Sequence, residues 1–188
     1  FQPVSEWEDL TDLRSPGGAD RILEWQPDLV ISMRFSLIFP PSLIAQIPKG
    51  IINVHPGPLP AYRGLFAPFW QALYDEPDFG CAVHLVDNGI DTGPVIDTAR
   101  VPRVPGRSLM WHTAQLYRGG AKIAASAVSN ISAGGAPHAV KSTGDGAYFR
   151  FPTSQDFARL ADTGMHLASG NDYAALLSEI FLADADSF

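Results

Sequence analysis

The chain has 188 residues, of which 46% are hydrophobic and 18% charged, and it carries a formal net charge of -7. This composition is that of one globular domain with a hydrophobic core, over residues 1–188, and no stretch is apolar for long enough to predict a membrane span. The acidic balance, without clustered Lys and Arg, argues against a broad electrostatic grip on nucleic acid.

The first third of the chain predicts a short helix and a strand. Residues 7–13 are compatible with a helix or a loop. Residues 16–18, Pro-Gly-Gly, interrupt the chain before a predicted helix from Asp20 to Trp25. Residues 29–32 then read as an apolar strand.

Residues 51–64 end a second apolar strand with two polar side chains. Side chains alternate along a strand, so Asn53 and His55 point to the same side and Val54 to the other. The prolines that follow cannot continue a strand or enter a helix interior, so we expect an irregular loop. An amide donor and an imidazole at a strand end are typical of an active site. A strand-closing asparagine beside a turn histidine is equally compatible with this segment alone.

Residues 79–96 predict a β-rich run, a glycine-bounded loop and a second short run. The loop carries Asp91 between Gly89 and Gly93, where glycines allow tight backbone turns or close approach of a ligand. Cys81, the single cysteine, is expected to be buried in the strand. It permits no intrachain disulfide, which fits the reducing cytoplasm.

The second half of the chain predicts mainly helices. A long helix is expected from Ser108 to Asn130, ended by the Gly-rich residues 132–137. Residues 144–153 read as a turn and a short strand, and residues 154–160 and 173–183 as helical stretches.

The five histidines lack the short ligand spacing of a zinc site and no cysteine cluster accompanies them, so no metal site is predicted. We expect His84 to line the site or pack in the strand. His112, His138 and His166 are expected to be surface or helix-capping residues.

Three segments with polar or glycine-bounded motifs follow one another along the chain: Asn53-Val54-His55, Leu59-Pro60-Ala61-Tyr62-Arg63-Gly64 and Gly89-Ile90-Asp91-Thr92-Gly93. With these segments the chain resembles the formyltransferases that use 10-formyltetrahydrofolate, a family that includes methionyl-tRNA and glycinamide ribonucleotide formyltransferases. The resemblance covers roughly residues 19–133.

The resemblance implies an α/β fold, with a Rossmann-like core whose mostly parallel sheet is flanked by helices. We expect this core over about residues 19–133 and a C-terminal extension over about 134–188. Family members generally place about two β-α units before the strand at residues 29–32, whereas only about 28 residues precede it here. We therefore expect a core that is shortened at the N-terminus, or a sequence whose first strands are missing.

The resemblance also implies an activity: transfer of a formyl group from 10-formyltetrahydrofolate to an amine or hydroxylamine nitrogen of a small metabolite, such as a modified amino acid or an amino sugar. Asn53 and His55 are expected to donate hydrogen bonds to the oxygen that becomes anionic, and Asp91 to orient His55 and relay the proton of the amine. Two alternatives are a 10-formyltetrahydrofolate hydrolase and a non-catalytic folate-binding or regulatory subunit.

The same family places the folate between two segments. Backbone groups at the end of the first strand are expected to bind the pteridine ring, and the loop that carries Asp91 to close the other side. The residues expected at the folate are Arg34, Phe35, Ser36, Leu37, Ile38, Val86 and Ile90. The oligomeric state is left open by the sequence.

Overall fold

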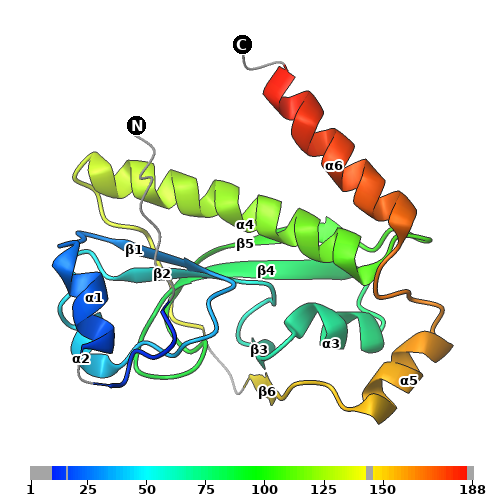
Figure 1. Cartoon of the computed structure of the whole chain (residues 1–188), viewed down its shortest axis with the longest axis horizontal. Coiled ribbons are helices and arrows are strands. Elements are labelled where there is room, and N and C mark those ends of the chain that lie inside the picture. The colour runs from blue at the N-terminus through cyan, green and yellow to red at the C-terminus, as the bar shows by residue number, and fades with distance from the viewer. Residues whose placement is uncertain (1–9, 16, 143–145, 186–188) are drawn as a thin grey trace.

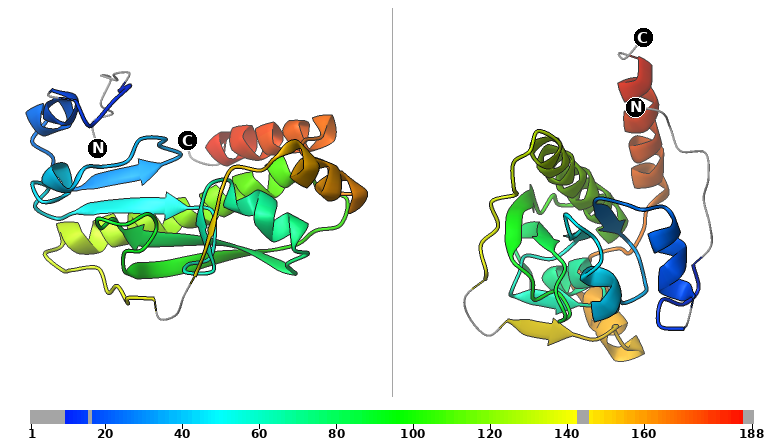
Figure 2. Two further views of the ribbon diagram at one scale, coloured as in Figure 1. Left: turned by 90° about the horizontal axis from the view of Figure 1, so that it is seen from below. Right: turned by 90° about the vertical axis from the view of Figure 1, so that its left-hand side faces the viewer.

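The computed structural model describes residues 10–15, 17–142 and 146–185, with side chains described as far as residue 179. Figure 1 shows a central sheet with the long helix α4 lying along it. In chain order the elements are α1 (Gly18–Glu24), β1 (Val30–Met33), α2 (Pro41–Ile44), β2 (Ile51–His55), β3 (Tyr62–Gly64), α3 (Ala67–Leu73), β4 (Asp78–Leu85), β5 (Val95–Pro102), α4 (Leu109–Ser132), β6 (Ala147–Phe149), α5 (Ser154–Asp162) and α6 (Gly170–Ala185). The views in Figures 1 and 2 agree that α1 and α2 lie at one end of the molecule and α3 and α5 at the other.

The α/β class is confirmed, but the prediction of a mostly parallel sheet is wrong. The main sheet has the order β1-β2-β4-β5. Among its described strands only the β1–β2 pairing is parallel, and the β2–β4 and β4–β5 pairings are antiparallel. Residues 86–94 join β4 to β5, too short a connection for the crossover that parallel strands need. After β2 the chain stays near the end of that strand, where His55 contacts Tyr62. Strand β4 therefore starts beside the end of β2 and runs back along it in the opposite direction.

The main hydrophobic core lies between this sheet and helix α4. A Cβ at Gly120 of α4 would lie 2.5 Å from Val54 Cγ1 and 2.9 Å from Cys81 Sγ, so the helix backbone packs directly on β2 and β4. Val54 therefore faces the layer opposite Asn53, as predicted. Cys81 is buried as expected, and this burial raises the pKa of its thiol to about 12.

Most predicted helices are present within a few residues of their expected bounds. Ser108 begins α4, where its hydroxyl accepts the N–H of Trp111. The sequence did not reveal α2, α3 or the short strand β3. Residues 10–13 lie outside any helix, and residues 7–9 and 144–145 of the predicted segments lie outside the described residues.

His112 corrects one expectation. It is fully buried rather than on the surface, and it bridges the start of α4: Nδ1 lies 2.9 Å from the carbonyl of Ser108, and Nε2 lies 3.0 Å from the N–H of Val104. The pKa of its imidazole is lowered, mainly because the ring is buried. Its ring serves as a hydrogen-bonded core group. The signal in the sequence is its place on the apolar face of the helix, three residues after Leu109 and four before Leu116.

The segment after α4 is joined to the core by strand pairing, aromatic stacking and hydrogen bonds. Strand β6 pairs in parallel with β3, and the Phe149 ring stacks on Tyr62 and Trp70 with centroids 5.3 and 5.1 Å apart. The carboxylate of Asp172, in the first turn of α6, accepts hydrogen bonds from the N–H of Ser108 and from Arg107. Hydrogen bonds from these two residues lower the pKa of Asp172 to about 2. Within the described residues, no helix is both long and apolar enough to cross a membrane.

Gln71 of α3 offers a test of how the loop after β2 is held. Its fully buried amide donates to the carbonyl of Pro56 at 3.0 Å and accepts the N–H of Gly80 at 2.6 Å. Gln71→Leu leaves both backbone groups unpaired, so we expect unfolding by urea to show a loss of about 2–4 kcal/mol. The exposed Gln46→Leu is the control, with an expected change below about 0.5 kcal/mol. Equal midpoints for the two variants would show that Gln71 does not hold the loop.

Candidate active site

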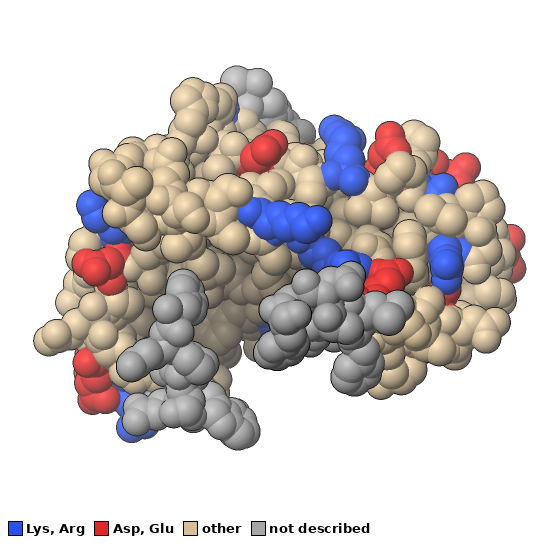
Figure 3. All heavy atoms as spheres, turned by 90° about the horizontal axis from the view of Figure 1, so that it is seen from above, with Lys and Arg blue, Asp and Glu red and all other residues tan. Residues whose placement is uncertain are grey.

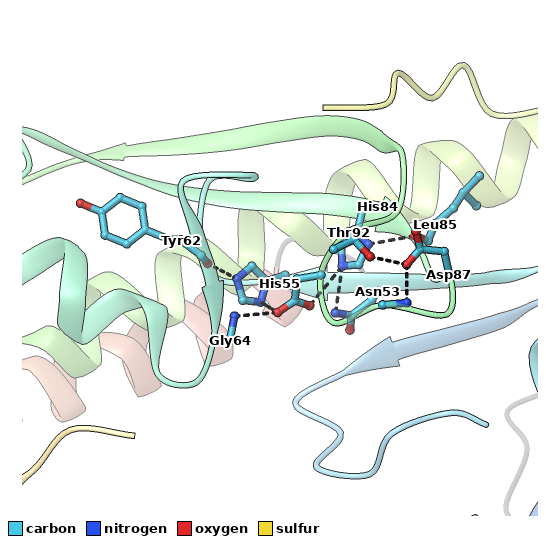
Figure 4. A network of polar contacts seen from close by, with 10 residues as sticks. Asn53, His55, Tyr62, Gly64, His84, Leu85, Asp87 and Thr92 are labelled. Atoms are coloured by element: carbon cyan, nitrogen blue, oxygen red, sulfur yellow. Dashed lines mark hydrogen bonds and ion pairs between the residues drawn. The ribbon is translucent and has the colours of Figure 1, made fainter. Parts of the chain in front are cut away.

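Polar side chains of β2 and β4, the two central strands of the main sheet, lie beside one another. Asn53 and His55 project from the same side of β2, and Asn53 is paired in register with His84 of β4. The loop between β4 and β5 returns along this side and brings Asp91 to both histidines. Figure 4 shows the resulting network, whose residues come from β2, β3, β4 and the loop between β4 and β5.

Asp91 lies at the centre of this network. Its Oδ2 accepts the N–H of Gly64 at 2.9 Å and lies 3.6 Å from Nδ1 of His55, while Oδ1 lies 3.5 Å from Nε2 of His84. Burial by itself would raise the pKa of Asp91. The neighbouring His84 and His55 rings and the Gly64 N–H outweigh burial, so the pKa is lowered and the carboxylate is ionised at neutral pH.

The loop that carries Asp91 is shaped by its own residues. Asp87 accepts hydrogen bonds from the N–H of Gly89 at 3.0 Å and the hydroxyl of Thr92 at 2.6 Å. A Cβ at Gly93 would lie 1.8 Å from the carbonyl oxygen of Leu85, so only glycine fits there. Asp87 and Thr92 were not predicted as site residues, although an Asp at the start of a glycine-bounded loop is a common turn signal.

His55 is buried, with one ring nitrogen hydrogen-bonded and the other facing Asp91. Its Nε2 lies 2.6 Å from the carbonyl oxygen of Tyr62, which can only accept, so Nε2 carries a proton. Burial lowers the pKa of His55, and the Asp91 carboxylate and the Tyr62 carbonyl oppose that shift only in part. At 3.6 Å, Nδ1 and Asp91 are too far apart for a direct hydrogen bond, which leaves Nδ1 available to a third group.

His84 lines the site, as expected, but its contact to Asn53 was not predicted. Its Nε2 lies 3.2 Å from Nδ2 of Asn53, and its Nδ1 lies 2.9 Å from the carbonyl of Leu85. The ring is 2% exposed. The signal in the sequence is a histidine in a buried run seven residues before Asp91, but the strand register is needed to place it opposite Asn53.

The residues predicted to bind folate are brought together only in part. Leu37 and Val86 pack against the same small cluster, which includes Ile51, so the two predicted segments meet there. Arg34 instead turns toward α4, with its guanidinium 5.7 Å from the centre of the Tyr117 ring. The remaining predicted residues, Phe35, Ser36, Ile38 and Ile90, are exposed.

Comparisons with known proteins find similarity to formyltransferases. Residues 10–126 match the family model described as formyl transferase. A methionyl-tRNA formyltransferase of Trichlorobacter lovleyi is 30% identical over 122 residues, which are 65% of this chain and 39% of that protein. A GDP-perosamine N-formyltransferase of Brucella melitensis is 34% identical over 77 residues, which are 41% of this chain and 30% of that protein. The chain thus spans well under half the length of these curated relatives.

Solved structures share the fold. A 4-N formyltransferase from Francisella tularensis has a TM-score of 0.66 at 19% identity, over 86% of this chain and 69% of that one. The formyltransferase PseJ from Anoxybacillus kamchatkensis, in complex with UDP-4,6-dideoxy-4-formamido-L-AltNAc and tetrahydrofolate, has a TM-score of 0.63 at 25% identity, over 76% and 71% of the two chains. With a family model matched over more than half of its residues, the chain belongs to the formyl transferase family.

Proposed function

We propose that this protein transfers the formyl group of 10-formyltetrahydrofolate to the amino group of a small metabolite, an amino sugar being the best supported acceptor. The observation that carries the proposal is the convergence of Asn53, His55 and Asp91 within one buried network. The similarity to PseJ, whose structure holds tetrahydrofolate and a formamido sugar, and to the GDP-perosamine enzyme supports the sugar class. The buried thiol of Cys81 is compatible with the cytoplasm as the site of action.

Asn53 is suited to stabilise the charge that develops on the formyl oxygen. When an amine attacks the formyl carbon, the carbonyl oxygen becomes anionic and the nitrogen cationic. The half-buried Asn53 amide has two N–H groups, of which the contact to His84 uses one. The second is free to bind the oxyanion, in a setting where the loss of such a donor costs about 3 kcal/mol.

His55 and Asp91 together are suited to remove the proton of the attacking amine. With Nε2 committed to Tyr62, a neutral His55 has its lone pair at Nδ1, on the side of Asp91. A proton taken there makes an imidazolium that the ionised Asp91 stabilises at 3.6 Å. His55 can donate a second hydrogen bond to the oxyanion only in this protonated state.

The donor folate is proposed to lie over the segments that follow β1 and β4. Ile38 and Ile90 are 50% and 44% exposed, so both apolar side chains are accessible to a ligand. They can flank a flat ring, while the backbone of residues 34–38 matches the donors and acceptors of a pteridine. Leu37 of the first segment and Val86 of the second pack against the same hydrophobic cluster.

The acceptor is proposed to approach over the β3–β6 ribbon. Arg63 and Tyr148 are register partners on this ribbon, and Tyr148 is 53% exposed. The Tyr148 ring lies against Gly64, whose N–H binds Asp91, so an aromatic surface adjoins the catalytic carboxylate. An exposed tyrosine ring can pack against the apolar face of a sugar.

The distribution of charge favours a small acceptor over a transfer RNA. Figure 3 shows, outside its grey atoms, a short row of basic side chains with acidic ones close by, and no broad basic area on this face. The net charge is -7. Neutralising several phosphates of a large polyanion needs many more clustered cations.

The direct test is a formylation assay with the donor and three amines: GDP-perosamine, dTDP-3-aminofucose and initiator methionyl-tRNA, with a sample lacking any amine. Mass spectrometry identifies the N-formyl product, and absorbance follows the release of tetrahydrofolate. We expect saturable formylation of an amino sugar. Efficient formylation of the tRNA would reject the small acceptor, and release of tetrahydrofolate without an amine would identify a hydrolase.

Tyr148→Ala tests the acceptor side. We expect the KM of the amino sugar to rise by roughly fivefold to tenfold, because the variant removes an aromatic contact of about 1 kcal/mol, while the KM of the donor is unchanged. Tyr173→Ala is the control, since Tyr173 is 57% exposed and lies on α6. An equal rise in both KM values would contradict a role at the acceptor.

A further inference from the structure

We propose that His84 is a positioning residue that fixes which atom of the Asn53 side-chain amide faces the reacting formyl group. The inference rests on the proposed function for its consequence, but its structural content is a hydrogen bond that can be observed by itself. It assigns a task to a buried histidine that formyl transfer, as derived above, does not otherwise use.

The hydrogen bonds of His84 determine its tautomer. The carbonyl of Leu85 can only accept, so the Nδ1 atom 2.9 Å away carries the proton of the neutral ring. In the neutral ring Nε2 is then an acceptor, and Nδ2 of Asn53 lies 3.2 Å from it, nearer than Oδ1 of Asp91 at 3.5 Å. The amide of Asn53 therefore donates one N–H to His84.

This hydrogen bond decides the orientation of an otherwise symmetrical group. An amide turned by 180° has almost the same shape, with Oδ1 in the place of Nδ2. Only the nitrogen can donate to an oxyanion, whereas Oδ1 in that place would repel it. An acceptor at Nε2 of His84 selects the productive orientation and leaves the second N–H free for the formyl oxygen.

The sheet holds the two side chains to this arrangement. Asn53 and His84 are direct partners on neighbouring antiparallel strands, and the His84 ring is 2% exposed, so water has little access to replace the contact. Both strands lie in the most buried part of the sheet, against α4. The orientation of the amide is therefore set before any ligand binds.

A second proton on His84 would reverse the selection. Nε2 would become a donor, and the Asn53 amide would have to turn its Oδ1 toward it. The titratable groups that face His84 are Asp91, with Oδ1 3.5 Å from Nε2, and His55, with ring centres 6.4 Å apart.

Nuclear magnetic resonance of the full chain, labelled with nitrogen-15, tests the hydrogen bond without any substrate. We expect His84 with a protonated Nδ1 and an unprotonated Nε2, and one Asn53 amide proton shifted downfield. The shift is retained in His84→Gln, whose Oε1 can accept in the same place, and lost in His84→Leu. The control His138→Leu leaves it unchanged, since His138 makes no polar contact to other described residues. An Asn53 signal that is the same in all four proteins would overturn the inference.

Kinetics test the consequence. His84→Leu should lower turnover roughly 10-fold to 100-fold with little change in the KM of the donor, and His84→Gln should recover most of the loss. In an Asn53→Ala background, His84→Leu should cause no further loss, since it acts through Asn53. A full additional loss there would overturn the positioning role. A wild-type protein without any formyl transfer would refute the proposed function, while the resonance experiment would still decide the hydrogen bond.

Discussion

Asp91→Asn is expected to lower formyl transfer by roughly 1000-fold or more while the donor still binds. The amide oxygen of Asn can accept the N–H of Gly64, so the loop keeps its shape. It has no charge to stabilise an imidazolium at His55 and cannot take up the proton of the amine. Single-turnover rates with saturating donor, together with the donor affinity from fluorescence titration, separate chemistry from binding.

The matched control for this variant is Asp97→Asn. Asp97 is an exposed residue of β5 whose carboxylate accepts only the N–H of its neighbour Thr98 among the described contacts, so it makes no contact with the network. We expect both rate and affinity to stay within about twofold of the wild type. Weak donor binding by Asp91→Asn, with an unchanged rate for the bound donor, would show a purely structural aspartate.

Asn53→Ala is expected to lower turnover roughly 100-fold or more, with a small effect on the KM of the donor. The variant removes the amide that donates to the developing oxyanion, an interaction stronger in the transition state than in the bound substrate. Steady-state kinetics at saturating acceptor measure the loss, and circular dichroism verifies the fold. His55→Ala should lose a similar factor, because it removes the group that receives the proton.

Asn130→Ala is the control for Asn53→Ala, since Asn130 is exposed on α4 and far along the chain from the network. We expect it to be as active as the wild type. Near-normal turnover by Asn53→Ala, in a protein of unchanged fold, would remove the amide from the mechanism and leave only the His55–Asp91 pair.

Local patterns in the sequence determined much of this protein. The alternation of side chains along an extended chain was enough to place Asn53 and His55 on one side of β2 and Val54 on the other. The apolar periodicity from residue 109 was enough for α4. Glycines on both sides of Asp91 marked a loop of special shape. Each of these signals depends on neighbours a few residues apart, and such interactions are present in the sequence itself.

The tertiary structure decided what depends on partners distant in the chain. The antiparallel entry of β4 places His84 opposite Asn53, 31 residues away, and the loop from β4 places Asp91 beside His55. Strand β3 exists because β6 pairs with it from more than 80 residues later. A short strand gains its hydrogen bonds from its partner, and a polar side chain gains its charge state from whatever is buried around it. Neither can be read from the residues alone, because the same residues in another register would meet different neighbours.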